Sequence, residues 1–104
     1  MNNLWELPNP LPAHEQFDVL LQTPTITVER IISTGQVTPS EQWYDQARSE
    51  WVVLLQESAQ ITYDTGEVIN LVEGNYLWIA AHQKHRVSFT SQDPPCIWLA
   101  LHLD

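Results

Sequence analysis

The chain has 104 residues, which is enough for one domain with a hydrophobic core and too few for a second. Thirteen Asp and Glu residues against four Lys and Arg give a net charge of −9, so a phosphate backbone or an anionic membrane would repel it. We therefore expect neither nucleic acid nor membrane as a partner. No apolar run approaches a membrane span, and residues 1–13 lack the basic and apolar regions of a signal peptide, which predicts a cytoplasmic protein.

The N-terminal segment differs in composition from the rest of the chain. Residues 1–13 hold three of the seven prolines and are predicted to form an extended arm. Leu4 and Trp5 within it are expected to lie on the domain or on a partner subunit, because both are apolar. Residues 14–104 are predicted to form the folded domain.

The first strands of that domain follow the arm directly. Residues 17–21 form a short apolar run, and a turn follows at Thr23-Pro24. Residues 25–32 alternate, with Thr27, Glu29 and Ile31 on one face, and are rich in β-branched side chains, which indicates a strand. Gly35 begins a loop that is rich in Gly, Pro and Ser.

The rest of the chain repeats the pattern of short strand and turn. Residues 50–56 are nearly all apolar, which predicts a strand covered on both faces. Asp64-Thr65-Gly66 is typical of a hairpin turn with glycine at positive φ. Further strands are predicted at residues 59–63, 67–71, 76–79, 85–90 and 97–103. About eight short strands without a long helix are typical of a sandwich or barrel. Cys96 is the only cysteine, so it forms no internal disulfide, and it is predicted to be a small buried side chain at the start of the last strand.

Residues 25–103 resemble the cupin superfamily, a single-domain jelly roll or double-stranded β-helix barrel. The second motif of that family runs glycine, five residues, proline, one residue, glycine, two residues, histidine. Gly74 and His85 match its two ends, while Ala80 replaces the proline and His82 the second glycine. The strings 43–46, 50–56, 81–87 and 98–102 also resemble a group of small stand-alone bacterial cupins without a well-defined shared activity.

The first cupin motif is degenerate in this chain. It runs histidine, one residue, histidine, three or four residues, glutamate, six residues, glycine. Glu50 matches the glutamate, but Trp43 and Asp45, or Tyr44 and Gln46, stand in place of the histidines, and the closing glycine is Glu57. The resemblance therefore implies the barrel fold and not the usual three-histidine metal site.

The candidate site follows from strand parity and the register that the resemblance implies. Glu50 and His85 are expected to point into the barrel and to meet near its mouth. Asp45 is expected at the rim, and His102 is a candidate from a third strand. Tyr44, Glu50, Trp78 and His85 are the predicted pocket residues, and the aromatic rings among them suit sugars or flat ligands.

Three interpretations of this site remain open. The first is a metal-free pocket that binds a small molecule, so that the chain is a small cupin of undefined activity. The second is a divalent-metal site for Fe, Mn, Ni or Zn in an enzyme of small-molecule or sugar metabolism. Its metal ligands would be Asp45, Gln46, Glu50, His85 and His102. The third is a purely structural Glu–His pair.

Other histidine and basic residues are expected outside the pocket. His14 and His82 are expected on the surface, and Lys84 and Arg86 are expected to face solvent or a partner. No serine lies in a nucleophile motif, so the sequence identifies no catalytic residue and leaves open whether the protein is an enzyme. The apolar strand at residues 50–56 and the many tryptophans predict a homodimer, in which the arm crosses between subunits.

Overall fold

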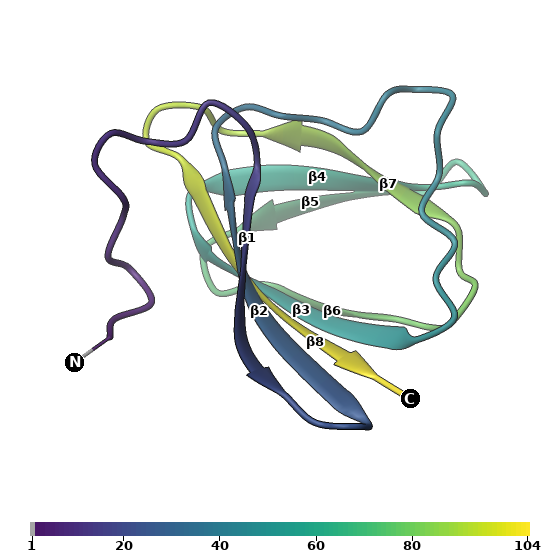
Figure 1. The fold of residues 1–104 in the computed structure, drawn as a ribbon. Helices are drawn as coiled ribbons and strands as arrows, with labels where there is room; N and C mark the ends of the chain where they lie inside the picture. The colour runs from purple at the N-terminus through teal and green to yellow at the C-terminus, as the bar shows by residue number, and fades with distance from the viewer. Residues whose placement is uncertain (1) are drawn as a thin grey trace.

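A computed structural model describes residues 2–104. Within this range the chain forms two antiparallel sheets that face each other (Figure 1). Their orders are β1-β2-β8-β3-β6 and β5-β4-β7. The strands are β1 (Gln16–Gln22), β2 (Ile26–Ser33), β3 (Ser49–Gln56), β4 (Ser58–Tyr63), β5 (Val68–Val72), β6 (Tyr76–Ile79), β7 (His85–Thr90) and β8 (Cys96–Leu103). The predicted all-β architecture is confirmed. No helix long and apolar enough to cross a membrane occurs among the described residues.

Tight turns between the strands depend on residues with positive φ. Gly66 has φ +92° in the β4–β5 turn, as predicted, and Gly74 has φ +89° in the next turn. Glu57 has φ 70° and His82 has φ 63°, in the left-handed region that normally favours glycine. These are the two positions at which a glycine of the cupin motifs is replaced in this chain. The backbone conformation of the motifs is therefore kept although their glycines are replaced.

The hydrophobic core lies between the two sheets. Leu54 of β3, Ile61 of β4 and Trp98 of β8 are almost completely buried there. Cys96 is fully buried at the start of β8, and its Sγ donates a hydrogen bond to the Ser58 carbonyl at 3.1 Å. Its predicted role as a small buried side chain is confirmed.

The outer face of the five-stranded sheet is apolar but not buried. In β3 only alternate residues are buried, including Glu50 and Val52, whereas Trp51 on the opposite face is half-buried. Within the described chain the strand is therefore covered by the barrel on its inner face only, and cover of the other face by a second subunit stays a prediction. The apolar run reflects a second apolar surface, which also carries the exposed side chains of Tyr76 and Trp78 on β6.

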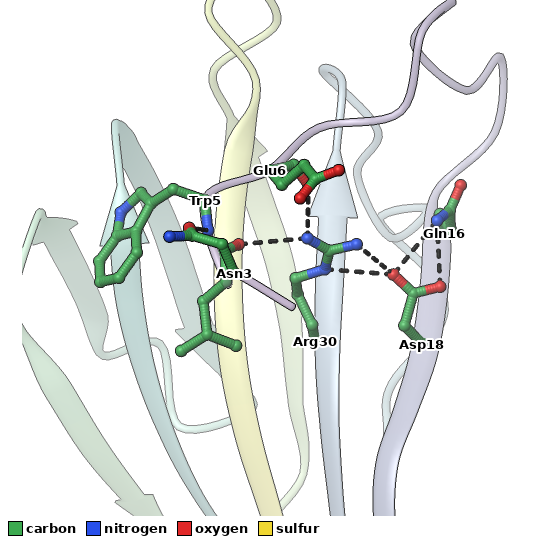
Figure 2. A network of polar contacts seen from close by, with 7 residues as sticks. Asn3, Trp5, Glu6, Gln16, Asp18 and Arg30 are labelled. Carbon is green, nitrogen blue, oxygen red and sulfur yellow. Dashed lines mark hydrogen bonds and ion pairs between the residues drawn. The ribbon is translucent and has the colours of Figure 1, made fainter. Parts of the chain in front are cut away.

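The N-terminal segment contains neither helix nor strand in residues 2–13, and part of it lies against this outer face. Arg30 of β2 donates hydrogen bonds to the carbonyls of Leu4 and Glu6, at 3.2 Å and 2.6 Å (Figure 2). The same guanidinium forms an ion pair with Asp18 of β1 at 2.8 Å. Trp5 is half-exposed and donates a long hydrogen bond, 3.4 Å, to the Leu55 carbonyl. These contacts hold the segment to its own subunit.

Candidate functional site

His85 begins β7 and is fixed from both sides. It pairs with Tyr63 of β4, and it forms an isolated bridge with Tyr44, whose ring stacks on the imidazole at 5.5 Å between centroids. The side chain is buried, and Nδ1 lies 2.9 Å from the Gln83 carbonyl. Because a carbonyl oxygen only accepts, Nδ1 carries the proton, and the Nε2 of the neutral ring is left as an acceptor.

Glu50 lies opposite this acceptor. It stands near the start of β3, in register with Ile79 of β6 and His102 of β8, and its Oε1 is 4.0 Å from His85 Nε2. Only 10% of its side chain is exposed, and no described residue donates it a hydrogen bond. Burial raises the pKa of the Glu50 carboxyl above its ordinary value, against the lowering effect of the two histidines. The Glu29 carboxylate adds a smaller effect in the raising direction.

His102 and Glu29 form a second acid–histidine pair in the same region. His102 Nε2 donates to Glu29 Oε1 at 2.8 Å, and both side chains are largely buried. This hydrogen bond raises the pKa of His102, while burial acts in the opposite direction and Glu50 reinforces the rise. His102 is therefore engaged by Glu29 and is not free to bind a third group through Nε2.

A third carboxylate, Glu15, is held by a buried hydrogen-bond chain. The Trp98 indole Nε1 donates to Ser33 Oγ at 3.2 Å, and the Ser33 hydroxyl donates to Glu15 Oε2 at 2.5 Å. Ser33 is completely buried and Trp98 nearly so. Burial raises the pKa of Glu15, while the Ser33 hydrogen bond opposes that rise. This series of hydrogen bonds therefore links Trp98 in the core to Glu15 at the edge of the site.

These groups line one cavity of about 80 Å³ that opens at the end of the barrel. Its polar wall combines carboxylates and imidazoles with Tyr44 and Gln46, and its apolar wall comes from both sheets. The lining residues are Glu15, Phe17, Glu29, Ile31, Tyr44, Gln46, Glu50, Val52, Ile61, Ile79, His85, Val87, Trp98 and His102. A second, wider hollow of about 220 Å³ shares Glu15, Tyr44 and Val87 with it and continues toward Trp43. The cavity thus combines acidic, imidazole and aromatic side chains with an apolar wall.

The structure brings together most of the residues predicted for the site, but not all of them. Glu50, His85, Tyr44, Gln46 and His102 line the cavity.

Two predicted residues lie elsewhere. Trp78 points to the outer face of the sheet and is 55% exposed, because its neighbour Ile79 takes the inward position on β6. Asp45 lies outside the cavity and pairs with the exposed His82 at 2.8 Å. Trp78 as a pocket residue and Asp45 as a cavity ligand are therefore corrected.

Two acidic residues of the cavity, Glu15 and Glu29, were not predicted from the sequence. Glu29 shares a face with Thr27 and Ile31, as the alternation of residues 25–32 indicates, and this face points inward. The parity groups Glu29 with Thr27 and Ile31 but does not say that this face points inward. Glu15 precedes β1 and lies outside any alternating pattern, so no sequence signal identifies it.

The donors present do not form a preassembled metal centre. Within residues 2–104 no three His, Cys, Asp or Glu side chains converge closely enough to hold a metal ion. Of the predicted ligands in the described chain, Glu50 and His85 lie 4.0 Å apart, whereas His102 is bound to Glu29 and Asp45 to His82. A divalent-ion site with these residues would need further ligands or rearranged side chains.

The barrel is similar to several solved structures of other proteins. Neither a comparison with sequence profiles of protein families nor one with curated proteins gave a match. A solved structure from Ralstonia eutropha JMP134, described as a putative mannose-6-phosphate isomerase, shares 36% identity over 100% of this chain and 97% of that protein, with a TM-score of 0.92.

Two more distant structures share the fold. A cupin superfamily protein from Desulfitobacterium hafniense DCB-2 is 19% identical, covers 98% of each chain and gives a TM-score of 0.74. A double-stranded β-helix protein from Klebsiella pneumoniae is 18% identical over 99% of this chain and 88% of that one, with a TM-score of 0.77. With the degenerate motifs around Glu50 and His85 on the same barrel, these likenesses show that the chain belongs to the cupin superfamily.

Proposed function

We propose that this protein binds a small polar molecule in the barrel cavity, with Glu50 and His85 as the groups that contact it. The observation that carries the proposal is a pair of largely buried side chains, Glu50 and His85, whose Oε1 and Nε2 lie 4.0 Å apart, face the same cavity and receive no hydrogen bond from a described residue. Buried polar groups in folded proteins nearly always have a hydrogen-bond partner, and leaving one unmade costs free energy. A ligand that enters from the mouth would supply the missing donors.

The cavity argues against a phosphorylated sugar as this ligand, although the Ralstonia protein is described as a putative mannose-6-phosphate isomerase. Phosphate sites use Arg, Lys or helix N-termini. The cavity of this chain is lined by neither Arg nor Lys, and residues 2–104 form no helix. We therefore do not extend that activity to this protein.

A binding screen with matched variants tests the proposal. Small polar molecules, including polyols and free sugars, are screened by ligand-observed NMR against the wild type and against Glu50→Gln and His85→Gln. Glu73→Gln, in an exposed turn at the opposite end of β3 from Glu50, is the control. The proposal expects ligands that lose binding in both cavity variants and keep it in the control. Ligands that bind all four proteins equally would contradict it, as would a screen without any ligand.

A divalent metal is the second candidate, and the tautomer of His85 favours it. A histidine that binds a metal through Nε2 usually donates its other N–H to a carbonyl or carboxylate, as His85 does to Gln83. Elemental analysis of untagged protein purified without chelator distinguishes a metal site from a metal-free pocket. Near-stoichiometric Fe, Mn, Ni or Zn that is lost in Glu50→Gln and His85→Gln would support the metal site. Metal-free protein after attempted loading with these four ions would support the metal-free pocket.

A further inference from the structure

The cavity is strongly biased toward negative charge. Three glutamates line it, Glu15, Glu29 and Glu50, and the basic side chains in its wall are two histidines, of which His102 is already bound to Glu29. The pKa values of Glu15, Glu50 and Tyr44 are all raised, because burial and their mutual repulsion disfavour further negative charge there. A ligand that adds a positive charge would relieve this repulsion.

All four Lys and Arg side chains of the chain lie away from the cavity. Arg30 is bound to Asp18 on the outer face, Lys84 is exposed, and the Arg86 guanidinium lies 5.9 Å above the Trp43 ring. The charge of Arg48 opposes protonation of His102, but its Nε is 2.7 Å from Asp104. The cavity wall therefore contains no Lys or Arg side chain with which to compensate an anionic ligand.

The unsatisfied groups of the cavity are acceptors rather than donors. The Glu50 side chain is nine-tenths buried without a hydrogen bond from any described residue, and His85 Nε2 presents a lone pair because Nδ1 holds the ring proton. Aromatic rings of Phe17, Tyr44 and Trp98 complete the lining, and such rings attract cations through their faces. Donors, positive charge and small size are thus the properties that complement this cavity.

We infer that the cavity selects a small primary ammonium group over neutral and anionic groups of the same size. This inference rests on the proposed function, whose site it makes more specific. An ammonium carries three donors on a compact charge, which matches two or more acceptors that face one cavity. A cavity of about 80 Å³ admits a group of a few heavy atoms, and the rest of a larger molecule would extend through the mouth toward Trp43.

Three probes of nearly equal size and different charge test this inference: propylammonium, 1-propanol and propionate. Their binding is followed by NMR titration, with the Trp98 indole N–H and the His85 ring as reporters. We expect propylammonium to bind at least about tenfold more tightly than propanol, since only the charged probe interacts with buried carboxylates, and propionate not to saturate. Glu29→Gln and Glu50→Gln should each weaken propylammonium severalfold and leave propanol unchanged. Glu73→Gln should change neither.

Each other outcome contradicts the inference. Equal affinity for propylammonium and propanol would overturn the ammonium preference while supporting a binding pocket. Tighter binding of propionate or inorganic phosphate would also overturn it. If no probe saturates, the inference is wrong, and the wider screen with polyols and sugars decides the proposed function separately. Should Glu29→Gln misfold through loss of its His102 contact, Glu15→Gln removes a cavity charge without touching that pair.

Discussion

The buried chain from Trp98 through Ser33 to Glu15 makes Ser33→Ala an informative perturbation. The Ser33 hydroxyl accepts from the Trp98 indole at 3.2 Å and donates to Glu15 at 2.5 Å, and Ser33 has no exposed surface. Alanine removes the oxygen and leaves the indole N–H without an acceptor, which costs about 1–3 kcal/mol for a buried donor. Glu15 is only part-buried and can turn to water, so the indole dominates, and we expect a loss of about 2 kcal/mol.

Urea denaturation at constant pH measures this loss, with Ser40→Ala, an exposed serine, as the control. A double-mutant cycle with Trp98→Phe isolates the indole contact, because Ser33→Ala should cost about 1 kcal/mol less once the N–H is absent. Ser33→Ala should also raise the pKa of Glu15 further, since the hydroxyl now opposes its rise. A loss below about 0.5 kcal/mol, or one that is equal in the Trp98→Phe background, would refute the reasoning.

Three further predictions concern the carboxylate, the backbone and the outer face. Because burial raises the pKa of Glu50 above 4.5, the folded state binds more protons than the unfolded state above that pH. Glu50→Gln should therefore gain stability relative to the wild type as pH rises from 4.5 through the folded-state pKa. A stability difference that stays constant in urea titrations from pH 4 to 8 would contradict this. Glu57→Gly should stabilise the folded protein by about 0.5–1 kcal/mol, because the relief of left-handed backbone strain exceeds the entropy that glycine adds to the unfolded chain. Glu73→Gly is the comparison. A Glu57→Gly variant that is less stable than the wild type would show that Glu57 is unstrained. The outer face of the sheet carries an apolar row that includes Trp51 and Trp78. We therefore expect a homodimer, which Trp78→Glu should convert to a monomer in light-scattering measurements. A monomeric wild type would refute this.

The fold was predictable because the local signals agree with one another. Gly66 and Gly74 mark turns, β-branched residues mark the strands, and the spacing from Gly74 to His85 fixes the second motif. The left-handed conformations of Glu57 and His82 show why the resemblance holds even where its glycines are missing: the barrel imposes the turn, and these residues accept the strain.

The site was less predictable, because parity alone does not say which face points inward. On β6 both faces are apolar, so Trp78 and Ile79 were equally good candidates for the cavity, and the pairing with β3 decides for Ile79. Glu29 lies on the more polar face of β2, which a one-sided pattern would assign to solvent. Glu15 depends on a hydrogen bond to Ser33, a contact between segments that no local pattern reveals.

The proposed function depends on His85 Nε2 as an acceptor that faces the cavity. A long-range ¹H–¹⁵N spectrum of the histidine rings, recorded during titration with a ligand from the screen, tests it most directly. We expect neutral His85 to carry its proton on Nδ1 and its Nε2 resonance to move as the ligand binds, in step with the Trp98 indole. A proton on Nε2 in the free protein, or a ligand that saturates while Nε2 stays unmoved, would contradict it.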